Sequence, residues 1–316
     1  MKAILFPGQG SQIVGMGSEF YNNFDKAKDI FKEADEKLKF KISDLILKGP
    51  DTSLKLTENT QPAILTVSYA IYKILIEEFD FDIKNIKYFA GHSLGEYSAL
   101  LCAGSLKFTD ALFLLHERGK AMQKAVPVGK GLMLAILGLR IDEIIDYISK
   151  TKIENICEVA NDNADGQIIV SGDKISIENL QNILKKDKKK SIVLPVSAPF
   201  HCSLMKNAAE EMKDKIFSIK FSQPIKEIIT NVTASPETKP ENIKKLLVEQ
   251  IYSKVRWRET ILHMENNGIN EFIEIGPGKV LSGLVKRITK NRLSLSINSI
   301  EDIKNISKWI LKIKKF

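Results

Sequence analysis

The residues with the clearest chemical potential are Gly91-His92-Ser93-Leu94-Gly95, which follow an apolar run and precede a helical pattern. A G-x-S-x-G motif between a strand and a helix is typical of a nucleophile elbow, in which a tight turn exposes the serine hydroxyl. The amide of Leu94 would then lie at a helix N-terminus, where the helix dipole favours a developing negative charge. We therefore predict that Ser93 is a nucleophile.

Ser93 needs a base, and the chain offers four histidines, namely His92, His116, His201 and His263. His92 is adjacent to the serine, and an elbow should point neighbouring side chains apart. His116 and His263 fall inside predicted helices. His201 follows Pro199-Phe200 in a loop, and loops beyond strands commonly carry catalytic groups, so we predict His201 as the general base. A third group usually orients the histidine ring, but the sequence shows no obvious Asp at a strand end between Ser93 and His201. A backbone carbonyl could orient the ring instead.

Arg118 lies on the apolar stripe of a helix predicted over Thr109–Ala125, together with Ala111, Leu115 and Met122. A buried guanidinium must be paired. It could form a structural salt bridge, or it could hold a substrate carboxylate through two hydrogen bonds. The pattern is compatible with both.

The loop Phe6-Pro7-Gly8-Gln9-Gly10-Ser11-Gln12 imitates a phosphate-binding turn, but Ile13 stands where the third glycine of a dinucleotide site belongs. We therefore expect no dinucleotide. The loop could be a simple tight turn, or an exposed amide near Gln9 could be a second oxyanion donor.

The composition is that of a globular protein, with 316 residues, 44% of them hydrophobic, and a net charge of +8. No apolar run reaches the ~18 uncharged residues of a membrane span, and no signal peptide is visible. Three cysteines without a C-x-x-C pair and four scattered histidines predict no disulfide framework, no metal site and a cytoplasmic location. The excess lysine indicates solvated faces rather than nucleic-acid binding.

The order of predicted elements indicates an α/β protein with a mostly parallel sheet covered on both faces. Strands are expected at Lys2–Phe6, Ile86–Ala90, Glu227–Thr230, Glu271–Ile275 and Leu293–Ile297, with helices between them and a last helix from about residue 301. Residues 127–197 differ, because they follow the βαββαβ order of a ferredoxin-like unit. The strands of this unit are expected at Leu132–Leu137, Ile156–Asn161, Gln167–Ser171 and Ile192–Val196. We predict a large domain over 1–126 and 198–316, interrupted by a small domain over 127–197.

Several motifs then occur together along nearly the whole chain. They are Phe6–Gln12, Gly91-His92-Ser93-Leu94-Gly95-Glu96-Tyr97, Glu117-Arg118-Gly119-Lys120, Pro199-Phe200-His201, Gln250 before Tyr252, and Glu274-Ile275-Gly276-Pro277-Gly278. Together they resemble the malonyl-CoA:acyl-carrier-protein transacylases of dissociated fatty acid synthesis, which are similar to the acyltransferase domains of polyketide synthases.

The resemblance implies an α/β-hydrolase-like large domain with a ferredoxin-like insertion. It implies that malonyl-CoA acylates Ser93 and that His201 is the base, oriented by the main-chain carbonyl of Gln250. The amides of Gln9 and Leu94 would form the oxyanion hole.

The resemblance also implies a substrate site. Arg118 would bind the malonyl carboxylate, and Asn163 would lie near the thioester. Phe200 would favour malonyl over methylmalonyl groups, by the ~1–3 kcal/mol that one methyl group is worth. The malonyl group would pass in a ping-pong reaction to an acidic acyl carrier protein that binds transiently. We expect no metal or redox cofactor and a monomeric enzyme.

Two other functions are compatible with the elbow. A serine esterase or thioesterase of the α/β-hydrolase type would need a catalytic Asp or Glu between Ser93 and His201, and it would give the inward Arg118 nothing to bind. A non-catalytic module that binds carrier proteins would have no need for intact Ser93, His201 and Arg118.

Overall fold

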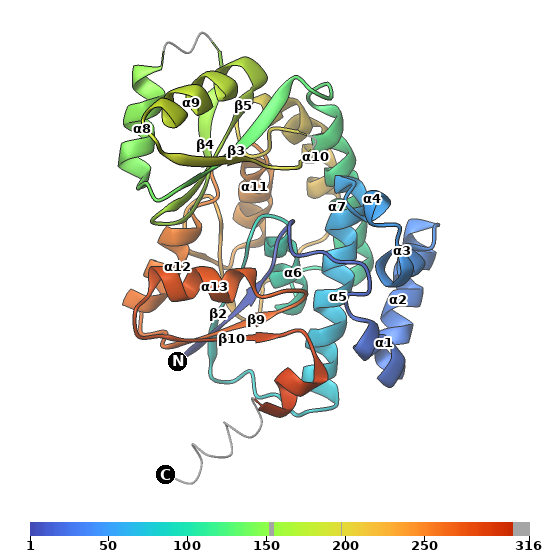
Figure 1. The fold of residues 1–316 in the computed structure, drawn as a ribbon. Coiled ribbons are helices and arrows are strands. Elements are labelled where there is room, and N and C mark those ends of the chain that lie inside the picture. Colours follow the sequence, from blue (N-terminus) through green and yellow to red (C-terminus); the bar gives the residue numbers. More distant parts are fainter. Residues whose placement is uncertain (152–154, 197, 306–316) are drawn as a thin grey trace.

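The computed structural model describes residues 1–151, 155–196 and 198–305, which form two sheets with their helices (Figure 1). The strands of the larger sheet are β1 (Lys2–Phe6), β2 (Ile86–Gly91), β7 (Glu227–Ile229), β8 (Pro236–Glu237), β9 (Glu271–Ile275) and β10 (Leu293–Ile297). They run in the order β10-β9-β1-β2-β7-β8, and only the β7–β8 pair is antiparallel. The predicted mostly parallel sheet is confirmed.

Helices flank this sheet on both faces. They are α1 (Ser18–Asn23), α2 (Asp25–Leu38), α3 (Ile42–Lys48), α4 (Asp51–Leu54), α5 (Thr57–Glu77), α6 (Gly95–Cys102), α7 (Phe108–Lys124), α10 (Lys206–Ser218), α11 (Pro240–Gln250), α12 (Trp257–Asn266) and α13 (Val280–Ile288). Along β1, Ile4 and Phe6 belong to one hydrophobic core, while Ala3 and Leu5 belong to a second core that includes side chains of α12 and α13. A central parallel strand is therefore apolar on both faces.

The smaller sheet stands with α8 and α9 at one end of the molecule (Figure 1). Its elements are β3 (Gly131–Leu137), α8 (Ile141–Lys150), β4 (Cys157–Ala164), β5 (Gln167–Asp173), α9 (Lys174–Lys186) and β6 (Lys190–Val193). The order β4-β5-β3-β6, with every pair antiparallel, is the arrangement expected for a ferredoxin-like βαββαβ unit. Leu134 and Ile136 pack with α8 and α9, whereas Met133 and Ala135 on the opposite face belong to the main core. The division into domains 1–126 with 198–316 and 127–197 stays a prediction.

Helix α5 begins at Thr57, so Pro62 lies inside it. Pro62 has no N–H to give to the carbonyl of Glu58, and that carbonyl instead accepts a hydrogen bond from His116 Nδ1 at 2.9 Å. The last strand of the smaller sheet ends at Val193 rather than Val196, because Pro195 cannot extend the ladder.

The chain end is described only in part. Residues 301–305 are helical, as expected, and the rest of the predicted last helix lies outside the described residues. Among the described helices, none is both long and apolar enough to cross a membrane. Cys102, Cys157 and Cys202 are free and buried.

Candidate active site

The loops that follow β1 and β2 meet at one edge of the larger sheet, because these strands are parallel neighbours with Phe6 opposite Gly91. The main-chain amide of His92 donates to the carbonyl of Phe6 at 3.1 Å. A Cβ on Gly95 would lie 2.2 Å from the Phe6 oxygen, and one on Gly8 would lie 2.5 Å from the His92 oxygen. The glycines of both motifs are therefore required by the close approach of the two loops.

Ser93 occupies the tip of a strained turn. Its φ of 53° lies in the left-handed region, which a side chain rarely adopts, as a nucleophile elbow requires. Asn231, which follows β7, holds this turn from the side: its Oδ1 accepts from the Ser93 amide at 2.7 Å, and its Nδ2 donates to the Gly91 carbonyl at 2.7 Å. One amide side chain thus fixes both ends of the elbow.

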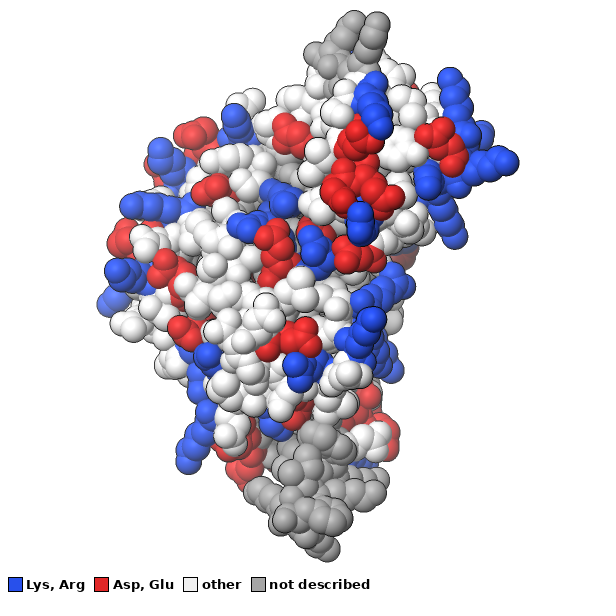
Figure 2. Space-filling model, turned by 90° about the vertical axis from the view of Figure 1, so that its left-hand side faces the viewer, with Lys and Arg blue, Asp and Glu red and all other residues white. Residues whose placement is uncertain are grey.

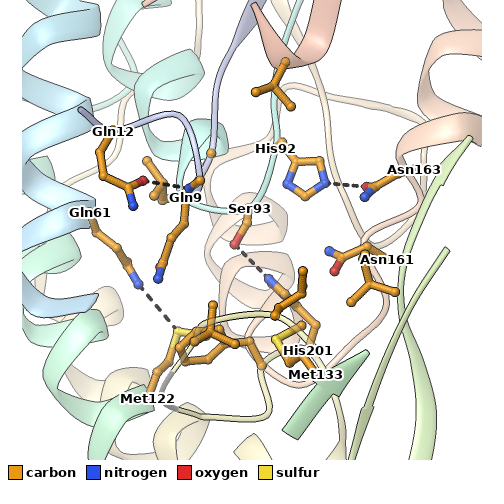
Figure 3. A pocket seen from close by; sticks show the side chains of 18 of the residues that line it. Gln9, Gln12, Gln61, His92, Ser93, Met122, Met133, Asn161, Asn163 and His201 are labelled. Atoms are coloured by element: carbon orange, nitrogen blue, oxygen red, sulfur yellow. Dashed lines mark hydrogen bonds between the residues drawn. The ribbon is translucent and has the colours of Figure 1, made fainter. Parts of the chain in front are cut away.

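The Ser93 hydroxyl lies 2.8 Å from His201 Nε2, and the two side chains point toward each other (Figure 3). His201 Nδ1 lies 2.9 Å from the main-chain carbonyl of Gln250. Gln250 is the last residue of α11, and the final carbonyls of a helix have no partner within it. Because a carbonyl can only accept, Nδ1 carries the proton and Nε2 is free to accept from the serine. Among the described residues, no carboxylate contacts His201 Nδ1, where the esterase alternative would require one.

The loop carrying His201 is held by the smaller sheet. Ser203, two residues further, donates from its amide to Glu158 Oε2 of β4 at 2.9 Å. His201 itself is buried, with 4% of its surface exposed. Burial and the positive charge of Arg118 lower the pKa of His201 to about 3. The imidazole is therefore neutral at physiological pH, which is the form a general base needs.

Arg118 is buried on α7 and faces the same serine. Its Nη2 donates to the Ser93 hydroxyl at 3.1 Å and to Gln250 Oε1 at 2.9 Å, and its Nη1 donates to Gln61 Oε1 at 2.8 Å. These acceptors are all neutral, and among the described residues no carboxylate forms an ion pair with the guanidinium. Its Nε has no hydrogen-bond partner within the described ranges. The structural salt bridge considered for Arg118 is thus absent from the part of the chain that the structure describes.

Ser93, His201 and Arg118 line a cavity of about 330 Å³ between the two sheets. Much of its wall is apolar, with Met122, Met133, Ile169, Leu194, Val196 and Phe200. His92 and Asn163 line the same cavity. His92 Nε2 lies 2.8 Å from Asn163 Oδ1, as Figure 3 shows. Asn163 and Phe200 therefore share the cavity with the nucleophile.

Gln9 and Leu94 also line this cavity. Leu94 caps the N-terminus of α6, where main-chain amides lack intrahelical acceptors. Within the described ranges, neither the Gln9 amide nor the Leu94 amide donates a hydrogen bond. Two unsatisfied amides beside a serine–histidine pair are the groups an oxyanion hole needs.

Three further residues of the site were not predicted: Gln61, Glu96 and Asn231. Glu96 gave a local signal, since it is a charged residue in an otherwise mostly apolar helical run, whereas Gln61 follows the polar residues 57–60 and gave none. Asn231 gave none, because its role depends on β7 lying beside β2. As for metals, no group of three or more His, Cys, Asp or Glu side chains in the described residues is arranged to hold one.

Residues 4–311 match the acyl transferase domain family. The chain belongs to this family. The acyl transferase is 44% identical over 303 residues to the malonyl CoA-acyl carrier protein transacylase of Bacillus subtilis, covering 95% of this chain and 94% of the relative. It matches the crystal structure of an acyl-carrier-protein-S-malonyltransferase from Bartonella henselae with a TM-score of 0.94 and 43% identity, over 97% and 98% of the two chains. A malonyl-transacylase solved with its type II polyketide synthase acyl-carrier protein matches with a TM-score of 0.92 and 38% identity, over 96% and 97%.

Proposed function

We propose that the protein transfers the malonyl group of malonyl-CoA to the phosphopantetheine thiol of an acyl carrier protein, in support of fatty acid biosynthesis. The observation that carries this proposal is the buried guanidinium of Arg118, which lies 3.1 Å from the Ser93 hydroxyl without a carboxylate partner in the described residues. A neutral acyl group would leave this charge unpaired, whereas a malonyl carboxylate would pair with it.

The reaction takes place in two acyl transfers through Ser93. His201 Nε2 takes the hydroxyl proton as Ser93 Oγ attacks the thioester carbonyl; the C–S bond breaks, and the proton passes to the leaving CoA thiolate. In the second half, His201 removes the proton of the carrier thiol, whose sulfur attacks the malonyl-serine ester, and the proton returns to Ser93. The Gln250 carbonyl keeps the imidazole in the tautomer that both steps need.

The remaining predicted residues act on the acyl group. The amides of Gln9 and Leu94 stabilise the oxyanion in each tetrahedral intermediate. Because Asn163 Oδ1 is occupied by His92, its Nδ2 is the group left to donate to the thioester side of the substrate. The ring of Phe200 restricts the space beside the malonyl methylene and so disfavours a methyl branch.

The proposed partner is an acidic carrier protein that binds transiently, by analogy with the relative solved in such a complex. The net charge of +8 would attract it. On the face in Figure 2, lysine and arginine side chains are interspersed with acidic ones. We further propose a monomeric, cytoplasmic enzyme, which size-exclusion chromatography and localisation would check.

The experiment that tests this function follows malonyl transfer from malonyl-CoA to a holo carrier protein by mass spectrometry of the carrier, together with free CoA. Stoichiometric malonyl-carrier and CoA support the proposal. CoA release with free malonate and no loaded carrier would indicate the thioesterase alternative instead. The apo carrier, which lacks the thiol, is the matched control.

A further inference from the structure

Glu96 is a buried carboxylate that the proposed acyl transfer does not use. It lies on α6 three residues beyond Ser93 and is 1% exposed. Its Oε2 accepts from the main-chain amide of Asn231 at 2.9 Å and from Gln250 Nε2 at 2.8 Å. A buried charge of this kind must be compensated by its surroundings.

The side chain of Gln250 stands between Glu96 and Arg118. Its Nε2 donates to Glu96, and its Oε1 accepts from Arg118 Nη2 at 2.9 Å. Nε2 also donates to the main-chain carbonyl of Ser93 at 3.1 Å. Because an ionised carboxylate and a carbonyl can only accept, both of them hold the nitrogen end of the amide on their side. The oxygen end is thereby turned toward the guanidinium.

This spacing meets two opposed requirements. A guanidinium buried without a negative charge nearby is costly, whereas one in direct contact with a carboxylate is already occupied. Burial raises the pKa of Glu96 to about 7, and the charge of Arg118 acts against that rise. Burial lowers the pKa of Arg118, and the charge of Glu96 acts against that fall. The two groups therefore stabilise each other's charge without touching.

We propose that Glu96 is the displaced counter-ion of Arg118, with the Gln250 amide as spacer, so that the guanidinium is oriented and compensated yet open to a substrate carboxylate. This inference rests on the proposed malonyl transfer. Glu96 is then a positioning residue. It changes the relative rates of acylation by anionic and neutral acyl donors without contacting the substrate.

The test compares the ratio of kcat/KM for acylation by malonyl-CoA and by acetyl-CoA, at pH 8, where Glu96 is largely ionised. Glu96→Gln keeps the shape and an acceptor for Gln250 but removes the charge. We expect the malonyl-to-acetyl ratio to rise about tenfold, because the substrate carboxylate no longer experiences the field of Glu96.

The double variant E96Q/Q250E has the same composition and net charge, but it places the carboxylate directly against Arg118. We expect the ratio to fall about 100-fold, because the guanidinium is already paired. Acetyl loading is measured in parallel, so that any effect on the Ser93–His201 pair that is common to both acyl donors cancels in the ratio. The two variants thus move one quantity in opposite directions, which a purely structural role would not do.

Three results would overturn the inference: a Glu96→Gln variant whose ratio does not rise, a double variant that keeps the wild-type ratio, or variants that slow both acyl donors equally. A wild-type protein that takes no malonyl group would refute the proposed function itself, before any variant is compared.

Discussion

Arg118 Nη2 donates to the hydroxyl of Ser93 over 3.1 Å, so the buried cation and the nucleophile are in direct contact. In a malonyl ester, one methylene separates the carbonyl from the free carboxylate. A group that binds this carboxylate must therefore lie beside the nucleophile, as Arg118 does.

Replacing Arg118 by Ala should slow loading from malonyl-CoA by about 10- to 100-fold, the value of a hydrogen bond to a charged group. Loading from acetyl-CoA should change far less, because it offers no carboxylate. Stopped-flow measurement of CoA release gives both rates. Arg118→Lys is the matched control for charge, and it should recover only part of the loss because it lacks the planar fork. Equal losses for both donors would remove the carboxylate-binding role.

The pKa of His201 leads to a prediction about pH. Burial and Arg118 lower it to about 3, so His201 should stay neutral, with the proton on Nδ1, as the pH falls from 8 to 5. In the unfolded chain, the His201 imidazole takes up a second ring proton near its ordinary pKa of about 6.5. The folded protein does not take up this second proton until about pH 3, so the free energy of unfolding decreases as the pH falls from 6.5 toward 3. Nitrogen-15 NMR of labelled histidines follows the ring directly, and titration of His201 near 6.5 in the folded protein would contradict the account.

Replacing Asn231 by Ala should remove the acceptor for the Ser93 amide and the donor for the Gly91 carbonyl. Two buried groups left without partners should lower the free energy of unfolding by about 2–4 kcal/mol. Acylation should also slow, because the elbow loses its anchor. Urea unfolding measures the first effect. Asn266→Ala, on an exposed position of α12, is the control and should change stability by less than about 0.5 kcal/mol.

Phe200→Ser should widen the cavity beside the acyl group. We expect the methylmalonyl-to-malonyl ratio of loading rates to rise by about tenfold, in the range that one methyl group is worth. A competition assay with both CoA esters and mass detection of the acyl-enzyme measures this ratio. An unchanged ratio would mean that Phe200, although it lines the cavity, does not contact the branch position.

The site residues that could be predicted from the sequence are those whose position depends only on neighbouring residues in the chain. Ser93 could be identified because strand, turn and helix signals lie within a few residues of it. The inward direction of Arg118 followed from helical periodicity, and the structure places it inside the fold. Likewise, the alternation of strands and helices was sufficient for the mostly parallel sheet and the βαββαβ order.

The parts that escaped prediction depend on contacts between distant segments. Asn231 anchors a serine 138 residues away, and Gln250 contacts Arg118 across 132 residues. The residues by themselves left the partner of His201 open, and only the family resemblance pointed to the Gln250 carbonyl. A helix end has a free carbonyl whatever its sequence, and tertiary packing decides what donates to it.

Whether Ser93 accepts the malonyl group is tested most directly by the intact mass of the protein after brief mixing with malonyl-CoA, with Ser93→Ala mixed in parallel. We expect one malonyl adduct on the wild-type protein, located on Ser93 by peptide mapping and absent from the variant. An adduct that persists in Ser93→Ala, or a wild-type protein that takes up no malonyl group, would contradict it.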